Sequence, residues 1–159
     1  MKKTQFFSFE IVSALLIFTA LFLFVLLIWS VKESDYKKNL LLTSLEKSSM
    51  SVGELLATTP GSPNNWSTTY IEQLGLADNY NTLNPIKLEN FFYLTQNNYS
   101  LVKELLGISS YDFFVQLEDF NNNVLRKSGN FSGYSQVVIW QENVLLNNSV
   151  FRLKVGVTI

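Results

Sequence analysis

The side chains that could do chemistry in this 159-residue chain come from a restricted set, because it contains no histidine and no cysteine. Their absence removes the commonest general base, the commonest transition-metal ligand, thiolate nucleophiles and disulfide bonds. The adjacent acids Glu118 and Asp119 lack the spacing of a general acid and base, and a solvated strand end explains them better. No glycine-rich phosphate loop is present. We therefore expect no enzymatic activity and no cofactor.

The segment Asp78 to Asn81 is the nearest approach to a metal-binding motif. It carries oxygen ligands at alternating positions, as calcium loops do. No glycine and no closing glutamate follow at the spacing of an EF-hand. A turn stabilised by Asx hydrogen bonds is the better explanation, and it also covers Asp119 with the asparagines at 121–123. The sequence therefore predicts no metal site.

Four Asn-X-Ser sequons are candidate sites of N-glycosylation, and all fall in predicted loops or at helix edges. The chain is also rich in asparagine and serine, so chance matches are the alternative explanation. A glycan would require a host with the corresponding machinery. The candidate asparagines are Asn65, Asn98, Asn130 and Asn147.

Glu10 is the most unusual ionisable residue, because it stands at the start of a long apolar run. A charge within hydrocarbon costs at least a few kcal/mol, so such a residue tends to have a partner or a function. One interpretation places the carboxylate at the headgroup level, solvated and stabilised by the helix dipole. The other gives it a partner of opposite charge.

The apolar run from Ile11 to Trp29 contains no charged residue. As a helix it covers roughly 30 Å, the thickness of a bilayer core, and it is too long for an ordinary cleaved signal. Trp29 fits an interfacial anchor. Lys2 and Lys3 precede the run, so the positive-inside rule predicts a cytoplasmic N-terminus and an extracytoplasmic remainder. The chain is expected to be a single-pass membrane protein.

The helix is expected to continue beyond the membrane, over residues 6–57, after a leader-like segment at residues 1–5. The stretch from Val31 to Leu56 contains no proline and one glycine, Gly53. Its apolar residues recur near helical spacing, which predicts an amphipathic second half. These residues are Leu41, Leu45, Val52 and Leu56. A Thr-Thr-Pro-Gly-Ser-Pro linker at residues 58–63 ends the helix.

Two lysines, a short polar stretch, two phenylalanines and Glu10 before a long apolar helix resemble the class III signal of type IV prepilins. This resemblance covers roughly residues 2–30. It implies cleavage by a prepilin peptidase, handling by a pilus assembly machinery, and packing of the apolar helices in a filament core. It also implies that Glu10 pairs with the N-terminal amine of a neighbouring subunit, which neutralises the buried carboxylate and fixes axial register.

Two cleavage positions fit the resemblance. A cut after Gln5 makes Phe6 the first residue and Glu10 the fifth, as in bacterial pilins. A cut after Thr4 makes Gln5 the first residue and Glu10 the sixth, as in archaeal pilins whose mature chains begin with Gln. The glycine that usually precedes the cut in this family is replaced by Thr4 or Gln5.

Residues 64–159 are expected to form one small α+β head. Thr69 to Leu76 predicts a short strand, and helices are expected from Pro85 to about Gln96 and from Leu101 to Leu106, with Ser100 as the second cap and Gly107 as its stop. The period then changes to two, which predicts an antiparallel sheet of about four strands. These strands lie over residues 111–118, 124–127, 136–146 and 150–159. Several head segments are similar to archaeal pilin-like head domains.

The near balance of 12 basic and 13 acidic residues gives no electrostatic case for nucleic acid binding. The aromatic residues of the head lack basic neighbours and fit a core or a subunit interface. The favoured function is a structural subunit of a type IV pilus-like surface filament, built from copies of itself or other pilin-like subunits, with roles in adhesion. The alternative is a monomeric membrane-anchored binding or envelope-accessory module.

Overall fold

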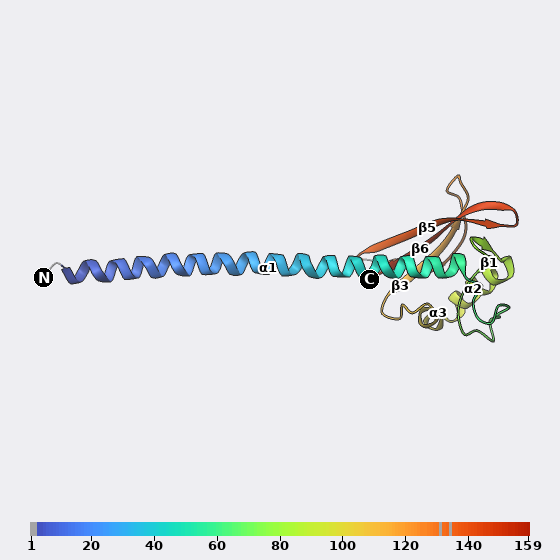
Figure 1. The fold of residues 1–159 in the computed structure, drawn as a ribbon, viewed down its shortest axis with the longest axis horizontal. Coiled ribbons are helices and arrows are strands. Elements are labelled where there is room, and N and C mark those ends of the chain that lie inside the picture. Colours follow the sequence, from blue (N-terminus) through green and yellow to red (C-terminus); the bar gives the residue numbers. More distant parts are fainter. Residues whose placement is uncertain (1–2, 131, 134) are drawn as a thin grey trace. The chain divides into compact units, whose positions relative to one another are not determined.

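The computed structural model describes residues 3–130, 132–133 and 135–159, with side chains described from Phe9 onward. Helix α1 (Lys3–Thr58) confirms the long N-terminal helix that the sequence predicts (Figure 1). The chain divides into two compact units, residues 1–41 and 42–159, and α1 contributes to both. It ends where Pro60 cannot continue a helix and Gly61 turns the chain with a φ of 79°.

The second unit is an α+β head built on a six-stranded sheet, as expected for the fold class. The strand order is β1-β2-β5-β6-β3-β4, and every neighbouring pair is antiparallel except β2 with β5. Four long strands match the predicted ones, and two very short strands extend the sheet at one edge. The strands are β1 (Ala77–Asn79), β2 (Thr82–Leu83), β3 (Asp112–Glu118), β4 (Val124–Gly129), β5 (Val137–Leu146) and β6 (Ser149–Thr158).

Tight asparagine turns set the register of the sheet. Asn147 and Asn148 have φ of 50° and 63°, which gives the β5–β6 hairpin a two-residue turn whose twist suits the strands. Asn122 has a φ of 62° in the β3–β4 turn. Asparagine tolerates this left-handed conformation better than most residues, so the predicted turns at both places are confirmed.

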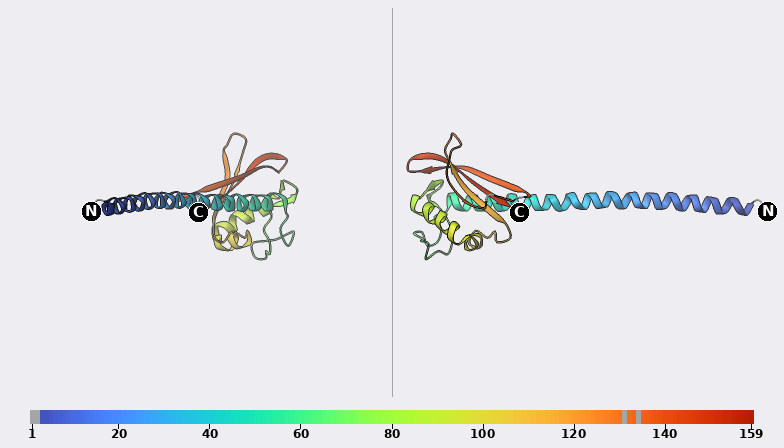
Figure 2. Two further views of the ribbon diagram at one scale, coloured as in Figure 1. Left: turned by 60° about the vertical axis from the view of Figure 1, so that its left-hand side comes forward. Right: turned by 180° about the vertical axis from the view of Figure 1, so that it is seen from behind.

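The part of α1 that belongs to the head lies between two layers. Figures 1 and 2 show the curled sheet on one side of it, with α2 (Pro85–Asn97) and α3 (Tyr99–Leu105) on the other. Its buried residues recur every three or four positions, which is the spacing of one helix face. They are Leu45, Ser49, Val52, Gly53, Leu56 and Ala57. The buried apolar face of the sheet includes Phe113, Val115, Leu117, Leu153, Val155 and Val157.

Asn84 caps α2, because its Oδ1 accepts hydrogen bonds from the backbone N–H groups of Ile86 and Lys87 at 2.8 and 3.1 Å. Pro85 occupies the first turn, as expected. For α3, the predicted cap at Ser100 is wrong: Asn98 takes that place and accepts from the Leu101 N–H at 3.4 Å. The helix stops before Gly107, whose φ is 69°.

The strand predicted over Thr69 to Leu76 is wrong. This segment forms two isolated bridges, Ser62 with Gln73 and Ser67 with Tyr70, and no ladder. The indole N–H of Trp66 donates to the Gly75 carbonyl at 2.8 Å and ties the loop together. Leu74 and Leu76 are buried by this folded loop, which forms no strand of the sheet, whereas Tyr70 is exposed.

Candidate functional site

The first candidate site is the apolar part of α1. None of the side chains at residues 9–40 is buried within the chain, although most of residues 9–31 are apolar. Ser13 and Thr19 donate to helix carbonyls, Ser13 to Phe9 at 2.9 Å and Thr19 to Leu15 at 2.8 Å. Their hydroxyls therefore need no outside partner in an apolar environment. Within the described part of the chain, the helix over residues 9–58 contains a stretch that is long and apolar enough to cross a membrane.

Glu10 differs from these hydroxyls. Its side chain is exposed, and it has no ion-pair or hydrogen-bond partner among the described side chains. The cleavage candidates Thr4, Gln5 and Phe6 lie in the first turns of α1, with side chains outside the described part. Met1 and Lys2 of the leader-like segment also lie outside it. Glu10 is consequently the acid that a partner would have to satisfy if this end of the helix enters an apolar environment.

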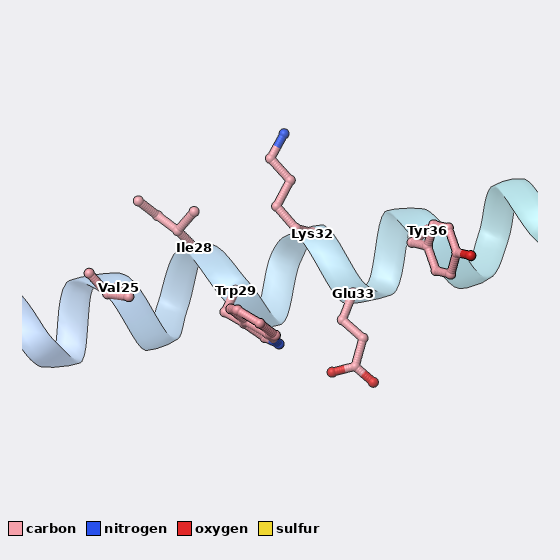
Figure 3. A pocket seen from close by; sticks show the side chains of 6 residues that line it. All are labelled: Val25, Ile28, Trp29, Lys32, Glu33 and Tyr36. Atoms are coloured by element: carbon pink, nitrogen blue, oxygen red, sulfur yellow. The ribbon is translucent and has the colours of Figure 1, made fainter.

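The other end of the apolar run is amphipathic. Figure 3 shows six side chains where apolar residues give way to charged ones: Val25, Ile28, Trp29, Lys32, Glu33 and Tyr36. Trp29 is 71% exposed and Ile11, at the start of the run, is 56% exposed. Glu33 pairs with Lys37 at 2.6 Å one turn further on. A single helix encloses no cavity, so this surface is suited to an interface with lipid or another helix.

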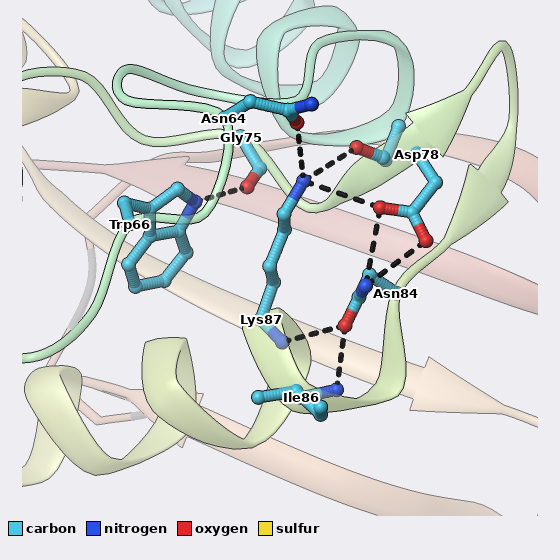
Figure 4. A network of polar contacts seen from close by, with 8 residues as sticks. Asn64, Trp66, Gly75, Asp78, Asn84, Ile86 and Lys87 are labelled. Atoms are coloured by element: carbon cyan, nitrogen blue, oxygen red, sulfur yellow. Dashed lines mark hydrogen bonds and ion pairs between the residues drawn. The ribbon is translucent and has the colours of Figure 1, made fainter.

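The second candidate site is a polar cluster around Lys87 in the head (Figure 4). The side chain of Lys87 is 6% exposed, and its ammonium donates to three oxygens. These are Asn64 Oδ1 at 3.2 Å, the Ala77 carbonyl at 3.1 Å and Asp78 Oδ1 at 3.3 Å. Asn84 Nδ2 donates to both oxygens of Asp78, at 3.1 and 2.9 Å. The cluster joins the loop before β1, strand β1 and the start of α2.

The side chain of Asp78, from the segment Asp78 to Asn81, belongs to this cluster. Three oxygens converge on one cationic centre, and that centre is the ammonium of Lys87. Residues 80 and 81 form the turn between β1 and β2, as predicted. The carboxylate of Asp78 accepts from the side chains of Asn84 and Lys87, and this replaces the Asx hydrogen bonds that were expected to stabilise the turn. Among the described residues, no group of three or more acidic side chains could hold a metal ion. The sequence analysis assigned no role to Lys87. The signal that could have identified it is the position of a lysine on the apolar side of the predicted helix.

Glu118 and Asp119 are separate structural groups. Glu118 is 3% exposed and pairs with Lys154 at 2.6 Å and Arg152 at 3.9 Å, so its interpretation as a solvated strand end is wrong. Asp119 accepts from the side chain of Asn123 at 2.8 Å, which lowers the pKa of this carboxyl, and the backbone N–H groups of Asn121 and Asn123 add to the effect. Neither carboxylate is arranged as a general acid or base toward the other.

The four sequon asparagines have different environments. Asn65 and Asn147 are exposed in turns. Asn98 is also exposed, but its Oδ1 caps α3. Asn130 Nδ2, the atom that a glycan would occupy, donates to Asp112 Oδ2 at 3.2 Å; its sequon includes Phe131, which lies outside the described residues. Asn65 and Asn147 are therefore the two whose amides a glycan would disturb least.

The architecture is pilin-like: a long apolar N-terminal helix whose C-terminal part packs against a mixed β-sheet. No protein-family model, curated protein or solved structure matches the chain.

Proposed function

We propose that this chain is a subunit of a type IV pilin-like surface filament that assembles through α1. The supporting observation is the exposure of the apolar half of α1, where no side chain from residue 9 to residue 40 is buried within the chain. Such a surface requires lipid or protein around it. A helix of this kind can lie in a bilayer before assembly and pack among other copies afterwards.

Glu10 supplies the specificity in this proposal. It is the sole charged residue between Phe9 and Val31, so its burial in a filament core would require an opposite charge. The N-terminal amine released by a prepilin peptidase, after Thr4 or Gln5, would provide that charge. Pairing then couples assembly to cleavage and to one axial register.

The test is the mature N-terminus together with one substitution. Mass spectrometry of protein from its native cells should find Gln5 or Phe6 as the first residue. Glu10→Ala should leave membrane insertion intact and abolish sedimentable filaments. Glu33→Ala is the matched control, because it removes an acid of the same helix that already pairs with Lys37 on the surface. Native protein that keeps Met1, Lys2 and Lys3 would contradict the proposal.

The topology can be tested separately, because the chain has no cysteine of its own. We propose a cytoplasmic N-terminus and an extracytoplasmic head. A single cysteine at Gln141, which is exposed on β5, should react with a membrane-impermeant maleimide on intact cells. One at Thr4 should not react, and it has to be measured on the unprocessed chain in cells without prepilin peptidase activity, because cleavage after Thr4 or Gln5 removes it. A monomeric membrane-tethered module would give the same labelling but no filaments and no loss on Glu10→Ala.

A further inference from the structure

Strand β5 has a long open edge. On one side it pairs with β6 along its whole length, from Val137 to Leu146. On the other side lies β2, and among the described residues Thr82 with Leu145 is the one paired position there. None of residues 137–143 is buried, on either face of the sheet. This stretch is therefore a strand edge open to solvent, to which a further strand can add.

Hydrogen bonds at the two ends of β5 show which backbone groups lie on this edge. The Leu145 N–H donates to the Asn81 carbonyl on the β2 side at 2.7 Å, whereas the Gln136 carbonyl accepts from Ile159 on the β6 side at 3.3 Å. Alternate residues of a strand direct their N–H and C=O groups to the same edge. The odd-numbered residues therefore direct theirs to the open edge. They are Val137, Ile139, Gln141 and Asn143.

Strand β4 is the last strand at the opposite end of the sheet. The Asn130 N–H donates to the Phe113 carbonyl of β3 at 3.0 Å, so by the same alternation Lys127 and Gly129 direct their backbone groups away from β3. A hollow of about 340 Å³ lies between this strand and α2, so the helix does not close the edge.

The two edge strands carry opposite charges. Glu142 is the one charged residue of β5, and β4 carries Arg126 and Lys127 and no acid. Glu142 and Arg126 also share a face of the sheet, because they lie opposite Leu153 and Leu117 of its buried face. Opposite charges that meet across two strands stabilise the pair. A second β5 would offer no base to Glu142.

The strand directions also match. β5 and β3 are each antiparallel to β6, and β4 is antiparallel to β3, so β4 runs opposite to β5. In two copies whose α1 helices point the same way, β4 of one copy therefore meets β5 of the next in antiparallel orientation.

An antiparallel pair of two β5 strands has the opposite requirement, because β5 runs along the head part of α1. Trp140 of β5 bonds to Ser49 of α1. Further along both elements, Leu145 bonds to Asn81, which in turn bonds to Ala57. Two such strands in antiparallel orientation would need α1 helices of opposite direction, which copies inserted in one membrane with the same topology do not have.

We propose that β5 of one copy pairs with β4 of a second copy and so continues the sheet from head to head. The register that opposes Glu142 to Arg126 also opposes Gln141 to Lys127 on the other face. The two strands are different surfaces, so each copy binds one neighbour through β5 and another through β4, and the contact can repeat along an assembly. The inference rests on the proposed filament for the common direction of the copies, and it adds a contact between heads to the packing of α1.

The experiment is a disulfide cross-link on filaments, because the chain has no cysteine of its own. Hydrogen-bonded partners in an antiparallel ladder lie about 5.5 Å apart at Cα, which a disulfide can bridge. Lys127→Cys combined with Gln141→Cys should give a series of covalent multimers on oxidation, and neither single variant should give dimers. Within one head the two positions are separated by β6 and β3, roughly 14 Å, which excludes a disulfide inside the chain. Glu104→Cys with Gln141→Cys is the control and should give no multimers, because Glu104 is exposed on α3.

A charge exchange in the double-cysteine chain tests the register. Glu142→Arg alone and Arg126→Glu alone should each lower the yield of multimers about threefold or more, because like charges then face each other. Both changes together restore an opposite pair and should recover the yield. Glu104→Arg is the matched control and should leave the yield unchanged. The melting temperature of these variants should stay near that of the unmodified chain, because Glu142 and the pair of Arg126 with Glu89 are exposed.

The outcomes separate the pairing of heads from the assembly through α1. Sedimentable filaments of the double-cysteine chain that give no multimers would overturn the pairing and leave the proposed filament intact. Dimers from either single-cysteine variant would overturn it in favour of a strand that pairs with itself. If Glu10→Ala left filaments and multimers unchanged, the pairing would stand and the role of Glu10 would fall. A chain that forms no filaments under any condition would overturn both.

Discussion

The hydroxyl of Ser49 accepts a hydrogen bond from the backbone N–H of Trp140 at 3.0 Å and so joins α1 to β5. The same hydroxyl donates to the carbonyl of Val155 on β6 at 3.0 Å. Trp140 and Val155 are paired residues in the β5–β6 ladder. One buried side chain of the helix thus bonds to two neighbouring strands, and it fixes the position of the helix along the sheet.

Ser49→Ala should destabilise the head by about 1–3 kcal/mol, because it leaves the part-buried N–H of Trp140 and the buried carbonyl of Val155 without their partner. Ser51→Ala is the matched control, since Ser51 is exposed on the same helix and its change should stay within about 0.5 kcal/mol. Chemical unfolding of the full chain in detergent, followed by tryptophan fluorescence, measures both. Equal unfolding midpoints for the two variants would contradict the bridging role.

Gly53→Ala should destabilise the head, against the usual helix preference. In an open helix alanine is favoured over glycine by about 1 kcal/mol. Here a Cβ at position 53 would collide with the indole ring of Trp140. The collision should cost about 1–3 kcal/mol, measured by the same unfolding experiment. Trp140→Leu in the Gly53→Ala background should recover part of the loss, whereas a more stable single variant would show that the ring does not rest on this glycine.

Lys87→Met should destabilise the head by about 1–3 kcal/mol even though methionine has a similar length and suits a buried position. The change leaves three oxygens, on Asn64, Ala77 and Asp78, without the ammonium that donates to them. Water can reach the half-exposed Asp78 and offsets part of this free-energy cost. Lys47→Met is the control, because Lys47 is exposed on α1. The ammonium would be dispensable if both variants unfolded like the unmodified chain.

Low pH should lower the free energy of unfolding of the head. Hydrogen bonds from Lys103 and Asn123 lower the folded-state pKa values of Asp112 and Asp119, so the native head binds fewer protons than the unfolded chain. Their stabilisation is present above the unfolded pKa of about 4 and is lost as pH falls through the depressed values. Solvent limits the contribution of Asp112, whose side chain is 40% exposed, to less than about 1 kcal/mol.

The measurement is the unfolding midpoint of the full chain at several pH values between about 6 and 2. Asp112→Asn should give a flatter profile below about pH 4 than the unmodified chain, because it removes one of the two groups. Superimposable profiles would show that Asp112 gains nothing from its partners.

Local signals in the sequence were sufficient for most of the elements. Pro85, the asparagines at 147–148 and the alternation in β3 and β6 each act over a few residues. They therefore predict a helix start, a turn and strands without knowledge of the fold. Glu10 and the apolar run stand out for the same reason, since composition alone makes them unusual.

The missed features depend on distant partners. Strand β2 has two residues and exists because Thr82 pairs with Leu145 of β5. Lys87 has no signature of its own, and its importance follows from oxygens up to 23 positions away. Glu118 was interpreted as solvated because its partners, Lys154 and Arg152, lie on another strand, and the residues next to Glu118 in the sequence do not indicate them. Tertiary contacts decide these cases, and a pattern within one segment does not contain them.

The exposure of residues 9–40 of α1 has an evolutionary consequence. Since none of these side chains is buried within the chain, substitutions among apolar residues there escape selection for the stability of the head. Their sequence can drift to match bilayers of different thickness or new helical neighbours. The face from Leu45 to Ala57 lacks that freedom, because each change there is felt by the core of the head. A single helix is therefore expected to be under two kinds of selection, for packing with lipid or other copies before about residue 42 and for packing within the head after it.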